Sequence, residues 1–330
     1  MHMYDVYGIG NALVDIEYAV TEDQLTELEI DKGVMTLVDS ARQRSVMSAL
    51  QDNPQHRSCG GSAANSIIAV TQFGGSAFYS CRVANDHVGT FYFEDLLSHG
   101  VATNLTQHNR EDGVTGTCLV FVTPDADRTM NTHLGITEEL ATPDLVTDAI
   151  GVSRYLYIEG YLAPSASARA AVRRAKQAAH DAGTAVALTL SDPNMVEYFR
   201  AELDEMLEGG VDLLFSNEAE ARLMAGSESL GEAADCFKRL AKQFVVTRGP
   251  QGALVFDGKT LIDIPGVAAN AIDTVGAGDM FAGAFLYGLC HGMDHAAAGG
   301  LAAHASAILV TRYGPRMDTE QAQRVLRGDI

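Results

Sequence analysis

The chain has 330 residues, and its formal net charge at pH 7 is −20 because 43 acidic residues outnumber 23 basic ones. A chain of this length can bury a substantial core, as one large α/β domain or as two smaller domains. The acidic balance argues against nucleic acid or an anionic membrane as a partner, because both need a basic patch on the protein.

Missing motifs exclude further classes of protein. No GxxxxGK[ST] motif occurs, which excludes the P-loop route to phosphate binding. No apolar run approaches the length of a membrane span. The five cysteines are an odd number without a CxxC pair, so we expect reduced thiols in a cytoplasmic protein.

The first predicted strand covers residues 6–10 and is followed by Asn11 and Asp15. Gly8 and Gly10 fit the start of a dinucleotide-binding GxGxxG motif, but the third glycine is absent. Residues 15–20 resemble a strand more than a helix, which also argues against a dinucleotide fold. Further along, residues 61–73 are predicted to form a helix behind a Gly60-Gly61 turn.

Residues 15–40 and 113–136 break the alternation of strands and helices. Both regions contain strand-like pieces without intervening helices, and residues 117–123 are the clearest of these. We expect the pieces to pair into a small sheet that covers a cleft. The alternative is that they extend the main sheet, since antiparallel edge strands on parallel sheets are common.

From about residue 150 onward, short apolar runs alternate with helical patterns, which predicts parallel βαβ units. A helix is expected between Ser165, a good N-cap, and Gly183, a good C-terminal stop. Polar residues follow each strand, and ligands of open α/β sheets bind outside the carboxyl ends of the strands. Polar residues at the ends of four predicted strands therefore indicate one cleft. The four strands are residues 155–158, 186–190, 213–215 and 244–246.

Residues 272–279 place a carboxylate directly behind a glycine-rich turn that opens a helix. Gly276 and Gly278 allow successive backbone N–H groups, with that of Ala277, to point into one anion-binding hollow. Asp279 could accept a proton from a hydroxyl that attacks a phosphate held there. The alternative is an ordinary first-turn aspartate that the helix dipole favours.

Two of these segments together resemble the signatures of the ribokinase-like (PfkB) family of carbohydrate and nucleoside kinases. Residues 273–279 match its pattern DTxGAGD, and residues 59–66 resemble its N-terminal glycine motif. The resemblance covers nearly the whole chain. It implies an α/β fold, namely a ribokinase-like three-layer α/β/α sandwich with a mostly parallel central sheet and a small β-sheet lid. Residues 1–330 would form a single kinase domain, with the lid inserted from about 15–40 and 113–136.

The resemblance also implies roles for individual residues. Asp279 matches the catalytic base, and the Gly276, Ala277 and Gly278 amides would stabilise the transferring phosphate. Arg128, in the lid, matches a basic residue that can reach this phosphate, although a local partner for Asp125 and Asp127 is the alternative. The residues that match acceptor-binding positions of the family are Asn11, Asp15, Gly60, Gly61 and Asn65.

On the nucleotide side, the resemblance implies ATP and Mg²⁺ as cofactors. Glu220 matches the NxxE glutamate that holds Mg²⁺ through water, with Asn217 as its partner, while a helix capping box explains the same pair. Asp273 matches a position where relatives hold a monovalent cation, so K⁺ is a further candidate. The cofactor-binding positions are Asn194, Asn217, Glu220, Thr247, Gly249 and Gly252.

The acceptor is a small molecule, and its identity stays open between two classes. Residues 10–16 and 115–118 resemble adenosine kinases more than ribokinases, which favours phosphorylation of the 5′-hydroxyl of a nucleoside. The base could lie on Tyr18, Phe121, Tyr161 or Leu37. The alternatives are a sugar kinase for ribose, fructose or a related sugar, and a non-catalytic relative that binds a nucleotide or nucleoside. The protein could be a monomer or a homodimer.

Overall fold

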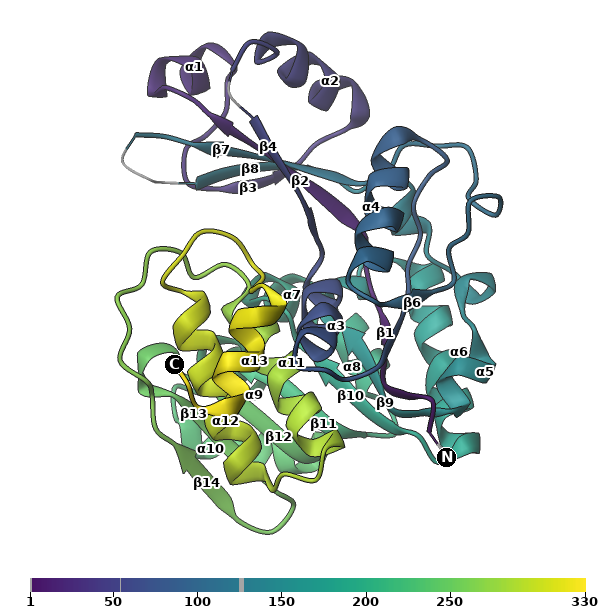
Figure 1. Ribbon diagram of the computed structural model, residues 1–330, viewed down its shortest axis with the longest axis vertical. Coiled ribbons are helices and arrows are strands. Elements are labelled where there is room, and N and C mark those ends of the chain that lie inside the picture. Colours follow the sequence, from purple (N-terminus) through teal and green to yellow (C-terminus); the bar gives the residue numbers. More distant parts are fainter. Residues whose placement is uncertain (1, 54, 125–127) are drawn as a thin grey trace.

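The computed structural model describes residues 2–53, 55–124 and 128–330 (Figure 1). Its main sheet has the strand order β14-β13-β12-β11-β10-β9-β1-β5-β6. All neighbours from β12 to β6 pair in parallel, whereas β13 and β14 form an antiparallel edge. The strands are β1 Tyr4–Ile9, β5 Ala77–Ser80, β6 Ala102–Thr103, β9 Ser153–Glu159, β10 Ala185–Thr189, β11 Val211–Asn217, β12 Ala241–Thr247, β13 Ala253–Phe256 and β14 Leu261–Ile264.

Helices cover both faces of the main sheet, and each face has its own apolar core. One layer comprises α3 Ser62–Gln72, α4 His87–Ser98, α11 Ala277–Cys290, α12 His295–Leu309 and α13 Thr319–Arg327. The other comprises α5 Thr147–Gly151, α6 Ala166–Ala182, α7 Pro193–Tyr198, α8 Arg200–Leu207, α9 Glu218–Ala225 and α10 Leu230–Leu240. Short 3₁₀ turns occur at η1 Gly135–Glu139, η2 Thr142–Asp144, η3 Gly160–Leu162 and η4 Gly249–Gln251. This is the α/β/α sandwich that the sequence predicted.

The predicted elements of the main domain are confirmed. The four expected strands are β9, β10, β11 and β12, and the helix between the first two is α6. Ser165 caps α6 by accepting from the Ala168 N–H, and Gly183 ends it with a φ of 75°. These local signals decided the helix bounds because a hydroxyl acceptor and a left-handed glycine satisfy the free backbone groups of a helix. Among the described residues, no helix combines the length and apolarity needed to cross a membrane.

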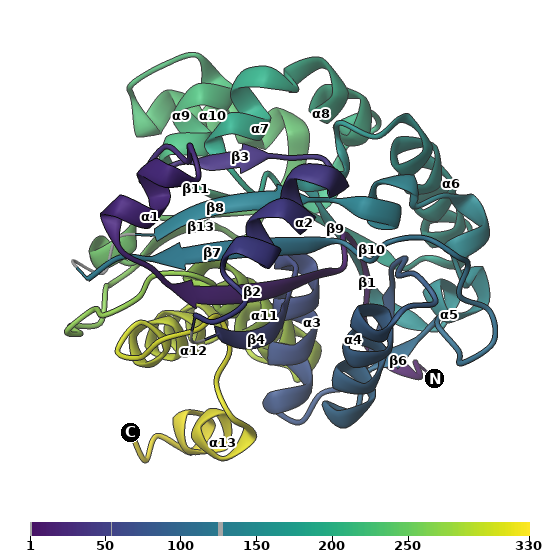
Figure 2. The same ribbon diagram turned by 90° about the horizontal axis from the view of Figure 1, so that it is seen from above.

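A second sheet with the order β3-β8-β7-β2-β4 stands beyond one end of the main sheet (Figures 1 and 2). The expected small sheet is therefore present, and the alternative of an extended main sheet is wrong. It also contains β4, which lies outside the two regions expected to supply it. Its strands are β2 Leu13–Ala19, β3 Met35–Leu37, β4 Gln55–Gly60, β7 Thr117–Val122 and β8 Arg128–His133.

The small sheet has one face covered by helices α1 Glu22–Glu27 and α2 Ser40–Ala49 (Figure 1). Expecting only strand pieces in residues 15–40 was wrong, because α1 forms within this region. A capping box explains it, since Thr21 and Gln24 satisfy each other's backbone N–H groups. Tyr18 and Phe121 stack with ring centroids 6.4 Å apart in the buried core of the small sheet.

Candidate active site

Asp279 is the third residue of α11, and two side chains from α3 orient its carboxylate. Ser62 Oγ donates to Asp279 Oδ1 at 2.6 Å, and Asn65 Nδ2 donates to Oδ2 at 3.0 Å. Gly276 is the N-cap of α11 and has a left-handed φ of 76°. The carboxylate is thus held by one donor on each oxygen, at a point where the first turn of α11 presents unsatisfied N–H groups.

Helices α3 and α11 lie side by side and run in the same direction, and Gly283 allows their close contact. A Cβ atom at Gly283 would lie 2.4 Å from the Ser66 backbone oxygen. Ser66 and Gly283 are each one helical turn beyond Ser62 and Asp279, respectively, so the two contacts follow each other along parallel axes. The positive ends of both helix dipoles therefore converge beside Asp279.

The surroundings of Asp279 change its acidity. Burial raises the pKa of its carboxyl to about 6, while the hydrogen bonds from Ser62 and Asn65 and the charge of Arg316 act in the opposite direction. A carboxylate with a pKa near 6 is ionised at neutral pH and is a stronger base than an ordinary aspartate. The arrangement can therefore take a proton from a hydroxyl placed next to Asp279.

The five predicted acceptor-binding residues lie together at this point. A Cβ at Gly60 would lie 2.6 Å from Asp15 Oδ2, and a Cβ at Gly61 would lie 2.4 Å from the Asn11 backbone oxygen. Gly61 has a φ of 98°, a region that favours glycine. Asn65, in the first turn of α3, joins this group to Asp279. Residues separated by more than fifty positions therefore lie next to one another beside Asp279.

Glu159, at the end of β9, is a buried carboxylate that is not among the predicted site residues. Its oxygens accept from the Asn11 N–H at 2.6 Å and from the Ala63 N–H at 2.8 Å. It therefore fixes the loop after β1 against the start of α3. The sequence signal that could have indicated Glu159 is an acidic residue at the end of an apolar strand, followed by glycine. Ser62 was missed too, although it directly follows the Gly60-Gly61 turn.

Replacing Glu159 with glutamine is expected to change how stability depends on pH. Burial raises the pKa of Glu159 to about 7, which is above its ordinary value of 4.5. The folded state therefore binds the proton more tightly, so this contribution is fully present below about pH 4.5 and is lost as pH rises through about 7. We expect the free energy of unfolding of the wild type to fall relative to Glu159→Gln between about pH 5 and 8.

Urea unfolding of the ligand-free proteins at several pH values measures this difference. Glu228→Gln is the control, because it is the same substitution at a side chain that is 96% exposed. A constant difference between the wild type and Glu159→Gln across the range would contradict the assignment to Glu159.

The predicted nucleotide-side residues Asn217 and Glu220 lie at the carboxyl end of β11. Asn217 N and Nδ2 donate to the two Glu220 oxygens at 3.0 and 2.6 Å, and Glu220 N donates to Asn217 Oδ1 at 2.8 Å. This is the capping box that the alternative interpretation predicted. Burial and the neighbouring Asp192 carboxylate raise the pKa of Glu220 to about 7, while the Asn217 hydrogen bonds lower it.

The donor set beside Glu220 fits a hydrated divalent cation. Each Glu220 oxygen keeps one lone pair beyond its bond to Asn217, and the Asp192 carboxylate is close enough to interact with Glu220 electrostatically. Mg²⁺ usually keeps several waters and binds few carboxylates. No group of three or more His, Cys, Asp or Glu side chains in the described part of the chain has the arrangement of a metal site.

The remaining nucleotide-side positions surround the end of β12. Thr247 is paired with Asn217 in the parallel ladder, so both side chains point to the same face of the sheet. Gly249 and Gly252 have φ values of 54° and 84° in the turn between the antiparallel strands β12 and β13. Asn194 is exposed, and its backbone N–H donates to Asp192 Oδ1 at 2.7 Å.

Asp273 and the glycine turn connect to the loop between α12 and α13. Asp273 Oδ1 accepts from the Val275 N–H at 3.1 Å, and Oδ2 accepts from the Gly314 N–H at 2.9 Å. The N–H of Ala277 donates to the Thr274 oxygen at 3.2 Å, so this amide already has an acceptor. Arg128 is the first residue of β8, and its side chain lies outside the described part of the structure, as do Asp125 and Asp127.

A cavity of about 550 Å³ borders Asn11. Tyr161 lies between this cavity and the rest of the site, since burial raises the pKa of its hydroxyl and the carboxylates of Asp192, Asp279, Glu159 and Glu220 raise it further. Tyr18 and Phe121 are buried between the small sheet and its helices, which argues against their lining this cavity. The residues that line it are Asn11, Leu134, Glu138, Glu139, Tyr161, Pro164, Ser165 and Ser167.

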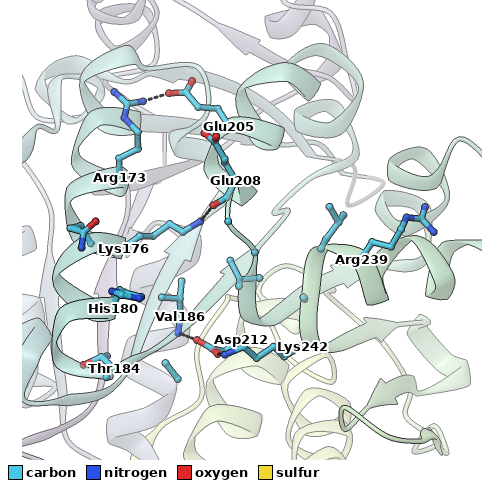
Figure 3. A pocket seen from close by; sticks show the side chains of 18 of the residues that line it. Arg173, Lys176, His180, Thr184, Val186, Glu205, Glu208, Asp212, Arg239 and Lys242 are labelled. Atoms are coloured by element: carbon cyan, nitrogen blue, oxygen red, sulfur yellow. Dashed lines mark hydrogen bonds and ion pairs between the residues drawn. The ribbon is translucent and has the colours of Figure 1, made fainter.

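A larger groove of about 810 Å³ lies at the opposite edge of the sheet, at the amino ends of β10, β11 and β12 (Figure 3). Several of its cations have partners. Lys242 bonds to Asp212 at 2.6 Å, Arg173 pairs with Glu205, and Lys176 donates to two backbone oxygens. It contains none of the predicted site residues.

Comparison with known proteins gives one family and a consistent fold. The model of the "pfkB family carbohydrate kinase" matches residues 34–322. The structure of an adenosine kinase from Sinorhizobium meliloti is 34% identical, covers 99% of both chains and has a TM-score of 0.88. A probable sugar kinase from Rhizobium etli is 32% identical over 100% of both chains, with a TM-score of 0.89. Mouse ribokinase is 27% identical over 70% of this chain and 71% of its own length.

Proposed function

Because this chain belongs to the pfkB family of carbohydrate kinases, which transfer phosphate from ATP to an alcohol, we propose that it phosphorylates the 5′-hydroxyl of a nucleoside, with adenosine as the first candidate. The observation that carries the proposal is the carboxylate of Asp279, which Ser62 and Asn65 orient where the α3 and α11 amino ends meet. A base held in this way can accept the proton of an attacking hydroxyl.

The proposed chemistry divides between two neighbouring groups of residues. Asp279 accepts the acceptor's proton, and the amino end of α11 stabilises the charge on the transferring phosphate. Glu220 and Asp192 would hold Mg²⁺ through water, and Mg²⁺ would neutralise charge on the ATP phosphates. Asp273 stays our candidate for a K⁺ site. The predicted ATP contacts are Asn194, Asn217, Thr247, Gly249 and Gly252.

The cavity beside Asn11 supports a nucleoside as the acceptor. It has a volume of about 550 Å³ and is lined by Asn11, one of the proposed acceptor-binding residues, while Leu134, Tyr161 and Pro164 provide an apolar wall. The other lining residues, which include Glu138, Glu139 and Ser165, are polar and could bind the polar edge of a base whose face lies on this wall. Sites for small molecules span about 300–1,000 Å³. The full-length similarity to the S. meliloti adenosine kinase supports the same acceptor.

We also propose that the small sheet acts as a lid within one domain of residues 1–330. In β2, Val14, Ile16 and Tyr18 are buried, whereas Asp15 and Glu17 alternate with them and point to the other face. That face also carries Cys118 and Val120, the partners of Asp15 and Glu17 on β7, so it is partly polar and partly apolar. Such a face above the acceptor would exclude water that otherwise hydrolyses ATP. Arg128 would act from this sheet on the phosphate.

Two other functions are kept as alternatives. The similarity to a probable sugar kinase and to a ribokinase favours a free sugar as acceptor. A non-catalytic binder of nucleotides or nucleosides would leave the oriented carboxylate of Asp279 without a use.

Release of ADP from Mg-ATP across a panel of nucleosides and free sugars, with and without K⁺, tests the proposal. We expect turnover with a nucleoside, first of all adenosine, and turnover lower by about 10²–10⁴ with the Asp279→Asn protein, which serves as the blank. Turnover restricted to sugars would select the sugar-kinase alternative. No turnover with any acceptor would support the non-catalytic binder.

A further inference from the structure

Arg316, in the loop between α12 and α13, lies behind the candidate base and contacts two helices. Its Nε donates to Asn65 Oδ1 at 2.8 Å, and its Nη1 donates to Asp95 Oδ2 at 2.7 Å. The Arg316 side chain is 13% exposed and that of Asp95 is 19% exposed, so solvent screens this ion pair only partly. Asp95 therefore holds the guanidinium against Asn65.

These contacts determine the orientation of the Asn65 side-chain amide, that is, which side its oxygen and its nitrogen occupy. An arginine can only donate hydrogen bonds, and a carboxylate can only accept them. With Oδ1 toward Arg316 and Nδ2 toward Asp279, both contacts of Asn65 are favourable. Turning the amide by 180° would place its N–H₂ against a guanidinium and its oxygen against a carboxylate, which is unfavourable on both sides.

We propose that Arg316, with Asp95 behind it, is a positioning residue that holds the Asn65 amide in the orientation in which it donates to Asp279. The inference rests on the proposed function in giving Asp279 the role of base. In this orientation one N–H of Asn65 serves Asp279 and the other stays available for an acceptor hydroxyl.

The loop that carries Arg316 also supports the glycine turn before Asp279. A Cβ at Gly276 would lie 2.6 Å from Pro315, and the Gly314 N–H donates to Asp273 Oδ2 at 2.9 Å. Arg312 Nη2 donates to the Arg316 backbone oxygen at 2.6 Å. The loop thus positions both the turn at the start of α11 and, through Arg316, the Asn65 donor of α3.

The polar and titratable groups that face Asp279 come from several elements. Besides the oriented contacts from α3, its environment includes Arg316 from the loop after α12, together with groups from β9 and η3. These neighbours are Ser62, Asn65, Tyr157, Glu159, Tyr161 and Arg316. Removing Arg316 takes away the cation in this set and frees the Asn65 amide to turn, and both changes favour the protonated form of Asp279.

The test is Arg316→Met, which keeps an unbranched apolar stem and removes the donors. With the best acceptor, we expect kcat to fall by about 10–100-fold, as for other small misplacements of catalytic groups, with KM for Mg-ATP changed less than about two-fold. We also expect the midpoint of the acid limb of the pH profile of kcat/KM, which should lie near pH 6 in the wild type, to rise by about one pH unit.

Three further variants separate positioning from folding. Arg316→Lys can donate to Asn65 or to Asp95 and should restore part of the activity. Asp95→Asn should move the acid limb in the same direction by less, and it serves as the test if Arg316→Met does not fold. Arg169→Met removes an arginine of similar exposure, 18%, that pairs with Glu205 at 2.7 Å, and should leave the acid limb unchanged.

An NMR measurement that does not depend on turnover tests this inference separately from the proposed function. In protein labelled with ¹⁵N-asparagine, the Asn65 side-chain N–H₂ signals should follow the ionisation of Asp279, with a midpoint that rises in Arg316→Met. An unchanged midpoint and an unchanged acid limb would overturn the role of Arg316. If the wild type turns over no acceptor but the midpoint is higher in Arg316→Met than in the wild type, only the proposed function would be overturned.

Discussion

Asp279→Asn is expected to lower kcat by about 10²–10⁴, which is the usual contribution of general acid–base catalysis. Asparagine has nearly the same shape and can keep a bond from Ser62 or Asn65, so the site should stay assembled. It cannot accept the proton of an attacking hydroxyl at neutral pH. Affinity for the acceptor and for Mg-ATP should therefore change little, which calorimetric titration measures alongside steady-state ADP release.

The matched control is Asp294→Asn, the same substitution at the start of the neighbouring helix α12. Asp294 Oδ1 caps this helix by accepting from the Ala297 N–H at 2.8 Å, and asparagine caps about as well. This variant should retain wild-type turnover. Near-normal turnover in Asp279→Asn would remove Asp279 from the role of base.

Gly61→Ala is expected to reduce kcat/KM for the acceptor by at least about 100-fold, because a displacement of about 1 Å in a catalytic site can have this effect. The added Cβ would lie 2.4 Å from the Asn11 backbone oxygen, and the φ of 98° strains any residue with a side chain. That oxygen cannot move away freely, since it accepts from Tyr79 Oη at 2.9 Å in the core. The start of α3 must shift instead, which carries Ser62 and Asn65 away from Asp279.

Gly183→Ala separates backbone strain from this steric effect. Gly183 has a similar left-handed φ of 75°, but a Cβ there would meet nothing within 4 Å. Both variants should lose stability on thermal unfolding, whereas only Gly61→Ala should lose acceptor turnover. Equal kcat/KM values for the two variants would show that Gly61 is needed for backbone conformation alone.

Much of the fold could be predicted from the sequence because it depends on local interactions. The apolar runs of β9 to β12 and the cap signals of α6 lie within short segments, and the structure confirms them. The glycine turn before Asp279 is also local, and it directed attention to this residue before the fold was known. Helix α1 was missed because its capping box lies in a short polar segment without a strong apolar period.

The sequence by itself determined the fold class, the family and the two glycine motifs, since neighbours along the chain carry these signals. Only the tertiary structure decided how the site is held. Arg316 and Asn65 are separated by 251 positions, and Ser62 and Asp279 by 217. Gly283 has no local marker either, because its role is the space it leaves for Ser66. Contacts over such separations depend on how helices pack on the sheet, which no local pattern records.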